Sequence, residues 1–179
     1  AGRVNTLLVA DRAAATTPGV LEALVGRRAA IEDLALTLRP IESRHELALE
    51  SAAGVIDDTR AAAAEKAATT SAMKTKPVFT YLANTLRSGD RQVPYSLVTA
   101  TDLSSITNAV NAGAAPAGPP PIVLNDWTAR DLRVKPGDPL TLEYYVWEEP
   151  GRLSSRTADF RVAAVVPIAG AAADRDFAP

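Results

Sequence analysis

The sequence predicts an α+β fold in which a few helices pack on a mixed or antiparallel β-sheet, with the chain divided into two lobes. One stretch, Ile122–Trp147, carries an apolar run, a helical turn, a tight turn and a strand in succession. A second observation is the pair of apolar runs at Val78–Leu86 and Gln92–Ala100, which flank a turn-forming loop as in a β-hairpin. A third is the alanine-dense segment from Asp57 to Ala72, because alanine is the best helix former.

The stretch that organises the chain is predicted to contain a strand, a short helix and a second strand, at Ile122–Leu124, Asp126–Leu132 and Leu140–Trp147. Between helix and second strand lies a tight turn. Pro136 restricts φ for this turn, and Gly137 supplies the positive φ that other residues resist. The apolar run Phe160–Ile168 is predicted to share a sheet with both strands and to pair with the second.

The N-terminal half is predicted to contain further strands and helices. In chain order these are a strand at Val4–Ala10, a helix ending near Arg27–Arg28, hairpin strands at Leu34–Leu38 and His45–Ser51, and the alanine-dense helix. Thr17 is the expected N-cap of the first helix and Pro18 its first residue, where a missing N–H has no cost. Pro40 is expected to end the first hairpin strand, and Pro94 favours an edge position for the strand that contains it.

The expected domain organisation is an N-terminal α+β lobe at 1–107, a linker at 108–121, a β-rich lobe at 122–170 and a frayed tail at 171–179. The linker is rich in glycine, alanine and proline, a composition that cannot bury a core. The lobes could also form one composite domain.

Composition excludes several classes of function. The formal net charge is −2 and the isoelectric point is about 5.5, so no electrostatic footprint for nucleic acid is present. With no Cys and one His, the 179-residue chain offers neither a thiolate nucleophile nor a usual transition-metal site. No apolar run has the ~20 residues that span a bilayer, and we expect any membrane link to lie outside this sequence.

Candidate chemical groups are few, and each has a simpler explanation. His45 begins a hairpin strand, where a solvated or capping role fits better than catalysis. The pairs Asp57–Asp58 and Glu148–Glu149 fit helix-dipole compensation and solubility better than acid–base catalysis. The Asp174–Asp176 segment lacks further oxygen ligands for a cation. We therefore expect no catalytic residue, no metal and no cofactor.

Four aromatic residues, Trp127, Tyr144, Tyr145 and Trp147, lie near the predicted tight turn. Aromatic side chains near a turn most often pack in a core, and they are also enriched at protein interfaces. The two alternatives are a packed aromatic cluster and a partner-binding surface, and these four residues are the candidates for such a surface.

Segments along most of the chain resemble the extracytoplasmic domains of FtsX-like and MacB-like ABC-transporter permeases. Ile122–Leu142 resembles their element of strand, asparagine, helix, Gly-Asp turn and strand, and Val4–Ala10 with its following helix resembles a second element. Shorter segments are similar to a large, mostly uncharacterised branch of these permeases: Pro77–Asn84, Val93–Ser96, Tyr144–Glu148 and Val166–Gly170.

The resemblance implies a MacB-like periplasmic core on the extracytoplasmic side of the bacterial inner membrane. It implies a non-catalytic domain that transmits ATP-driven motion and contacts a small-molecule substrate or a periplasmic protein. Its expected partners are the transmembrane helices of the same full-length chain and a separate ATPase subunit, with no nucleic acid. On this reading the sequence begins and ends inside a larger extracytoplasmic region.

Two alternatives stay open. The order of asparagine, short helix, Lys135–Asp138 and strand is also similar to the repeat of double-psi β-barrels, which would make this a binding domain of a cytosolic protein. Such barrels carry a second copy of the motif, and a second Lys-Pro-Gly-Asp is absent from this sequence. A small hydrolase is the other alternative, and no residue pattern favours it.

Overall fold

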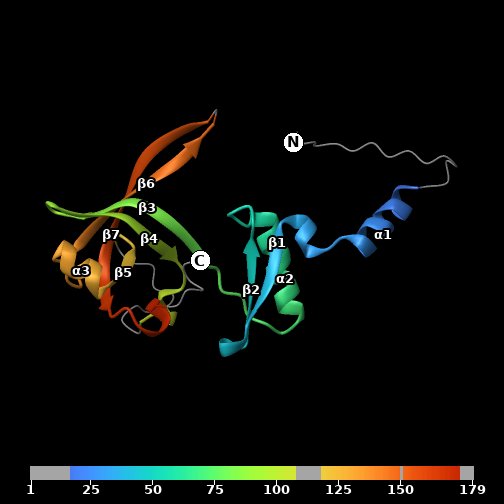
Figure 1. The fold of residues 1–179 in the computed structure, drawn as a ribbon, viewed down its shortest axis with the longest axis horizontal. Coiled ribbons are helices and arrows are strands. Elements are labelled where there is room, and N and C mark those ends of the chain that lie inside the picture. Colours follow the sequence, from blue (N-terminus) through green and yellow to red (C-terminus); the bar gives the residue numbers. More distant parts are fainter. Residues whose placement is uncertain (1–16, 108–117, 150, 174–179) are drawn as a thin grey trace. The chain divides into compact units, whose positions relative to one another are not determined.

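In the residues that the structure describes, the protein has an α+β fold built from three α-helices and two β-sheets (Figure 1). The structure is a computed structural model that describes residues 17–107, 118–149 and 151–173. The chain divides into two compact units, residues 1–74 and residues 75–179. Each unit has its own sheet, and the units are described separately below.

The described part of the first unit contains two α-helices and a two-stranded antiparallel sheet: α1 (Pro18–Arg28), β1 (Leu36–Ile41), β2 (Glu46–Ser51) and α2 (Asp58–Thr70). Thr17 is the N-cap of α1 and Pro18 its first residue, as predicted. Asp57 caps α2 by accepting a hydrogen bond of 2.9 Å from the backbone N–H of Arg60. This bond holds the pKa of the Asp57 carboxyl below its ordinary value of 3.8, because it favours the charged form.

The predicted hairpin in this unit is confirmed, but Leu34 lies in a 3-10 helix before β1 and His45 lies in the turn before β2, so neither belongs to the strands. Pro40 does not end the first strand; it lies within β1 and pairs with Leu47. A two-stranded sheet has only edge strands, and an edge strand tolerates the missing N–H of proline. Leu36 is the only buried hydrophobic residue that the described part of this unit contains.

The second unit is a curled five-stranded sheet with the strand order β4-β3-β6-β7-β5 (strands labelled in Figure 1). Its strands are β3 (Phe79–Ser88), β4 (Arg91–Ala100), β5 (Pro121–Asn125), β6 (Pro139–Glu148) and β7 (Arg152–Val166). All neighbours are antiparallel except β5 and β7, which run parallel. The predicted β3–β4 hairpin, the sharing of one sheet by the last three strands and the edge position of the Pro94 strand are confirmed.

The connection from β5 to β6 runs through α3 (Asp126–Leu132) and the predicted tight turn. Asn125 caps the helix by accepting a hydrogen bond of 2.7 Å from the backbone N–H of Thr128. Gly137 has φ 100, as its position in the turn required. The turn is held to β7 by two backbone bonds, in which Gly137 N–H donates to Val162 O (2.8 Å) and Val162 N–H donates to Asp138 O (2.9 Å).

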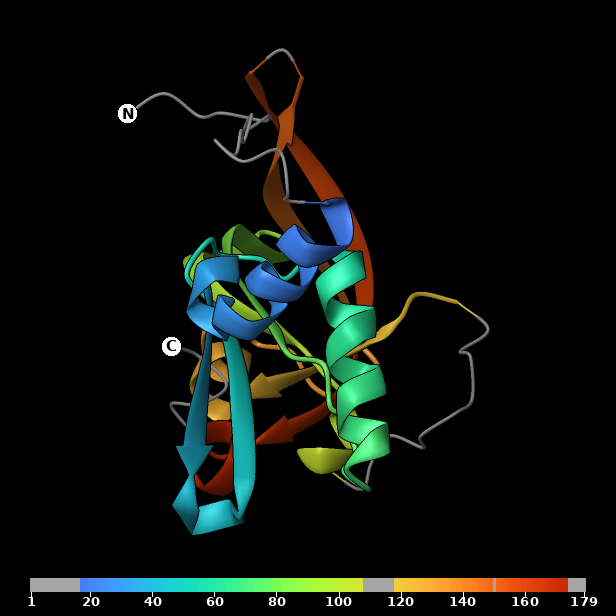
Figure 2. The same cartoon turned by 90° about the vertical axis from the view of Figure 1, so that its right-hand side faces the viewer.

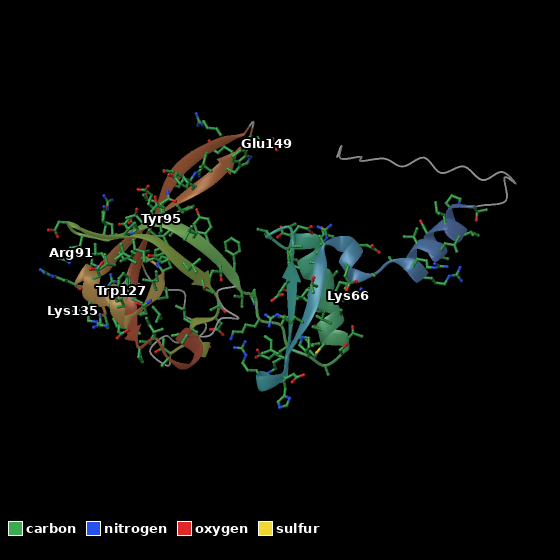
Figure 3. The ribbon with its side chains drawn as sticks, viewed as in Figure 1. Lys66, Arg91, Tyr95, Trp127, Lys135 and Glu149 are labelled. Carbon is green, nitrogen blue, oxygen red and sulfur yellow. The ribbon has the colours of Figure 1, made fainter. Side chains whose placement is uncertain are left out.

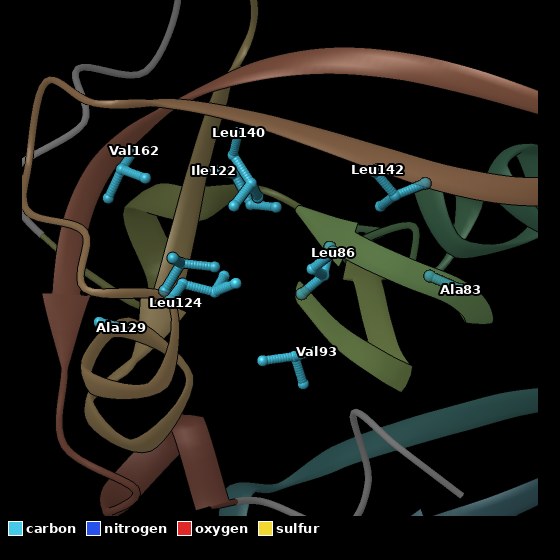
Figure 4. Close-up of a cluster of buried hydrophobic side chains, with 10 residues drawn as sticks. Ala83, Leu86, Val93, Ile122, Leu124, Ala129, Leu140, Leu142 and Val162 are labelled. Atoms are coloured by element: carbon cyan, nitrogen blue, oxygen red, sulfur yellow. The ribbon is translucent and has the colours of Figure 1, made fainter. Parts of the chain in front are cut away.

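The hydrophobic core of this unit lies between the curled sheet and α3 (Figure 4). Leu140 and Val162 are its most deeply buried large side chains, each 1% exposed. The remaining core residues come from β3, β4, β5, β6 and α3: Ala83, Leu86, Val93, Ile122, Leu124, Ala129, Leu132 and Leu142.

The curl of the sheet begins at a break in the β3–β4 ladder. Ala83 and Leu86 are both buried in the same core, although side chains three positions apart on a regular strand face opposite sides. Between them the ladder skips the pair of Asn84 and Tyr95, and Tyr95 has a left-handed backbone with φ 52. Such a break bends a strand pair and rotates it, so residues beyond the bend can face the same core.

The expected lobe boundary at 108–121 differs from the observed division. β3 precedes this segment in the chain, but it pairs with β6, which follows it. The division into units instead falls between Lys74 and Thr75. The strand expected at Val4–Ala10 and most of the expected linker lie outside the described residues.

We predict that Leu140→Ala lowers the free energy of unfolding by about 2–5 kcal/mol, because it leaves a cavity in a packed core. The matched control is Leu97→Ala on β4, where the side chain is 59% exposed and the loss should be within about 0.5 kcal/mol. Urea unfolding measures both. Equal losses in the two variants would contradict the assignment of the core.

Candidate functional site

An open apolar groove of about 520 Å³ lies on the inner side of the curled sheet. It falls within the 300–1,000 Å³ typical of ligand sites. None of its side chains carries a formal charge at neutral pH. Its lining comes from four strands: Phe79, Tyr81, Val98, Ala100, Leu142, Tyr144, Tyr145, Val146, Trp147, Ala158 and Phe160.

The groove exists because β3 and β6 separate after a short ladder. Their pairing covers three residues on each strand, from Thr85 opposite Glu143 to Arg87 opposite Thr141. Beyond Glu143, β6 continues to Glu148 and stays paired with β7. This part of the two strands, Tyr144–Glu148 paired with Arg152–Arg156, projects from the sheet and is called the β6–β7 arm (Figures 1 and 2).

The hydroxyl of Tyr81 bridges the separated strands. It accepts a hydrogen bond of 2.7 Å from the backbone N–H of Tyr145 and donates one of 2.9 Å to the carbonyl oxygen of the same residue. The Tyr81 ring also meets the Tyr144 ring edge to face, with centroids 6.1 Å apart. One side chain of β3 thereby satisfies backbone groups of β6 that the ladder leaves unpaired.

The far end of the arm carries a cluster of three charged side chains that pair with one another. Glu148 accepts hydrogen bonds of 3.1 Å from both Arg152 and Arg156 on β7. The bond from Arg156, with that from Arg152, holds the pKa of the Glu148 carboxyl below its ordinary value of 4.5. The pairing is therefore present at neutral pH and is lost as the pH falls through this lowered pKa.

Three of the four aromatic residues singled out in the sequence line the groove, namely Tyr144, Tyr145 and Trp147. Trp147 is 70% exposed and Tyr145 is 49% exposed. Trp127 is not part of this lining; it lies on α3 and is 54% exposed (Figure 3). The predicted cluster is thus divided between the groove and the outer surface of α3.

None of the polar candidates is part of the groove lining. His45 occupies the turn between β1 and β2 with φ 54, and Asp57 caps α2. Glu149 lies at the end of the arm (Figure 3), and Asp174–Asp176 falls outside the described residues. Within the described ranges, no group of three His, Asp or Glu side chains is placed to hold a metal ion.

Sequence reasoning missed the groove residues that β3, β4 and β7 contribute. Phe79 and Tyr81 alternate on β3, which indicated a strand face but not its neighbour. Their packing beside β6 depends on the break at Tyr95, and a tyrosine in the left-handed region has no clear signature in sequence.

The opposite face of the sheet carries a much smaller, polar hollow of about 50 Å³. It is lined by Thr85, Arg87, Gln92, Thr141, Glu143 and Thr157. A hollow of this size holds only a few water molecules. The apolar groove is therefore the stronger candidate for a functional site.

Comparison with models of known protein families and with curated proteins finds no match to this chain. In the part of the chain that the structure describes, the helices are too short or too polar to cross a membrane.

We predict that Tyr81→Phe frees the backbone of Tyr145 while keeping the ring in the groove. Losing bonds worth about 1 kcal/mol should speed hydrogen exchange at the Tyr145 amide by about fivefold. Tyr95→Phe is the matched control, since Tyr95 is 77% exposed and lies on β4. Unchanged exchange at Tyr145 in the Tyr81 variant would show that the bridge does not persist in solution.

We also predict that acidification below about pH 4.5 loosens the end of the arm, because protonated Glu148 no longer pairs with Arg152 and Arg156. Trp147 fluorescence in a Trp127→Phe background reports this change, with circular dichroism to exclude global unfolding. Glu148→Gln should remove the transition. A transition of the same midpoint in that variant would assign the effect to another group.

Proposed function

We propose that this chain is a non-catalytic extracytoplasmic domain of an ABC-transporter permease. The observation that carries the proposal is the ordered set of segments that resemble such permeases. Most of these segments belong to the second unit, where they form β3, β4 and the connection from β5 through α3 to β6. The resemblance therefore concerns a contiguous structural element as well as scattered sequence matches.

The packing of this unit supports a mechanical role. The Lys135–Asp138 turn is bonded to β7 through Val162, and Arg91 on β4 donates a hydrogen bond of 2.6 Å to the carbonyl oxygen of Asp131 on α3. These contacts connect α3 to β4, at one edge of the sheet, and the turn to β7, next to the other edge. A unit connected in this way moves as one body when its ends are displaced.

In the proposed mechanism, a separate ATPase subunit hydrolyses ATP and moves membrane helices that belong to the same full-length chain. The domain passes this motion to a substrate or partner outside the membrane. The apolar groove supports the recognition half of this role, since it offers a contact surface without acid–base or nucleophilic groups.

The location of the domain gives the test. Because this chain has no Cys, single cysteines can be placed at the exposed positions Glu65 and Leu97, one in each unit. We predict that a membrane-impermeant maleimide labels both positions in the full-length protein, freed of any other cysteine, in intact spheroplasts.

Labelling that requires permeabilised cells would overturn the extracytoplasmic location. It would favour the alternative of a binding domain in a cytosolic protein. A cysteine at the core position Ala83 is the negative control, because that side chain is 0% exposed and its replacement leaves no cavity.

A further inference from the structure

The edge of β6 that faces the groove is open beyond the short ladder with β3. Along a strand, the N–H and C=O groups of alternate residues point to the same side. The backbone N–H of Tyr145 points away from β7, because it donates to the Tyr81 hydroxyl. The backbone groups of Trp147, two residues on, therefore also point away from β7 and toward the groove. The ladder assigns them no partner strand among the described residues, since β3 pairs with β6 only up to Glu143.

The two edges of the arm differ in chemistry. The outer edge, on β7, carries Arg152 and Arg156, and charged residues on an edge strand oppose the addition of another strand. The β6 edge carries Tyr145 and Trp147 instead, both exposed and both beside an apolar groove. Only the β6 edge combines free backbone groups with apolar contact area.

The bridge itself indicates what the edge accepts. The Tyr81 hydroxyl accepts from the N–H and donates to the C=O of one residue, Tyr145. In an antiparallel sheet, a residue of the neighbouring strand makes these same two bonds. Tyr81 thus occupies the position of a strand residue and can be replaced by one.

We propose that the groove binds an extended, apolar segment of a partner polypeptide, which adds to β6 as a strand. The backbone of this segment forms hydrogen bonds with the backbone of Trp147. Once the Tyr81 hydroxyl moves aside, it also forms hydrogen bonds with the backbone of Tyr145. Alternate side chains of the segment enter the groove over Tyr144 and Phe160. A charged ligand finds no counter-charge in the lining, and the arginines nearby already pair with Glu148.

An extended apolar peptide would be the partner that the domain recognises in its proposed function, and in this respect the proposal rests on that function. The two fail separately, because peptide binding is measured on this chain alone and membrane location on the full-length protein. Absence of peptide binding leaves maleimide labelling unaffected, and the reverse also holds.

The probe is a peptide selected from a displayed library of nine-residue segments with alternating apolar and polar positions. The selected peptide is then made in two forms, one unmodified and one N-methylated at alternate residues facing β6. Since N-methylation removes N–H donors and keeps the side chains, we expect binding in calorimetry to weaken by at least about tenfold. Equal affinity of the two forms, or a library without a binder, would overturn strand addition.

The protein variants form a matched pair. Trp147 and Leu153 are opposite each other in the arm, and the backbone N–H of each points to an outer edge. Trp147→Pro removes the donor on the groove edge and should weaken binding by at least about tenfold, whereas Leu153→Pro removes the donor on the other edge and should leave it within about twofold. Equal effects of both would contradict the assigned edge, and Trp147→Ala separates loss of the ring from loss of the donor.

Two other occupants are tested in the same experiment. Palmitate that binds the protein and displaces the selected peptide completely would assign the groove to acyl chains. Self-association in light scattering that Trp147→Pro abolishes would assign the edge to a second copy of the chain. Either result would overturn the proposal; a monomer that binds the peptide and ignores palmitate supports it.

Discussion

The short ladder between β3 and β6 is the constraint on which the rest of the second unit depends. Where the strands pair, between Thr85–Arg87 and Thr141–Glu143, the sheet is continuous and its inner face is filled by core residues. Where they separate, the same inner face is open and becomes the apolar groove. The groove, the projecting arm and the Tyr81 bridge are three consequences of one separation.

Two local features determine where that separation occurs. The Lys135–Asp138 turn is bonded to Val162 and fixes the start of β6 against β7. The left-handed backbone of Tyr95 coincides with a break in the β3–β4 ladder, and such a break bends a strand pair. A regular ladder along the whole of β3 would place Ala83 opposite Tyr145, where the Tyr81 hydroxyl lies instead.

The sequence predicted those elements whose signals are local. The helix at Asp126–Leu132, the glycine turn and both hairpins follow from caps, turn residues and alternation, and each is confirmed. The separation of β3 from β6 was not predictable, because it depends on contacts between residues about 60 positions apart, such as Tyr81 with Tyr145. Trp127 is near the groove aromatics in sequence but absent from the groove lining, because nearness in sequence to a turn does not decide which side chains pack together.

Whether the groove is open in solution depends on the separation of β3 from β6 beyond Glu143, with Tyr81 bridging the gap. Nuclear Overhauser effects in the isotope-labelled protein test this most directly. Our account predicts backbone contacts between Thr85 and Glu143, none between Ala83 and Tyr145, and a contact between the Tyr81 ring and the Tyr145 amide. Backbone contacts between Ala83 and Tyr145 would mean that the ladder continues and that the groove is closed in solution, which would contradict the account.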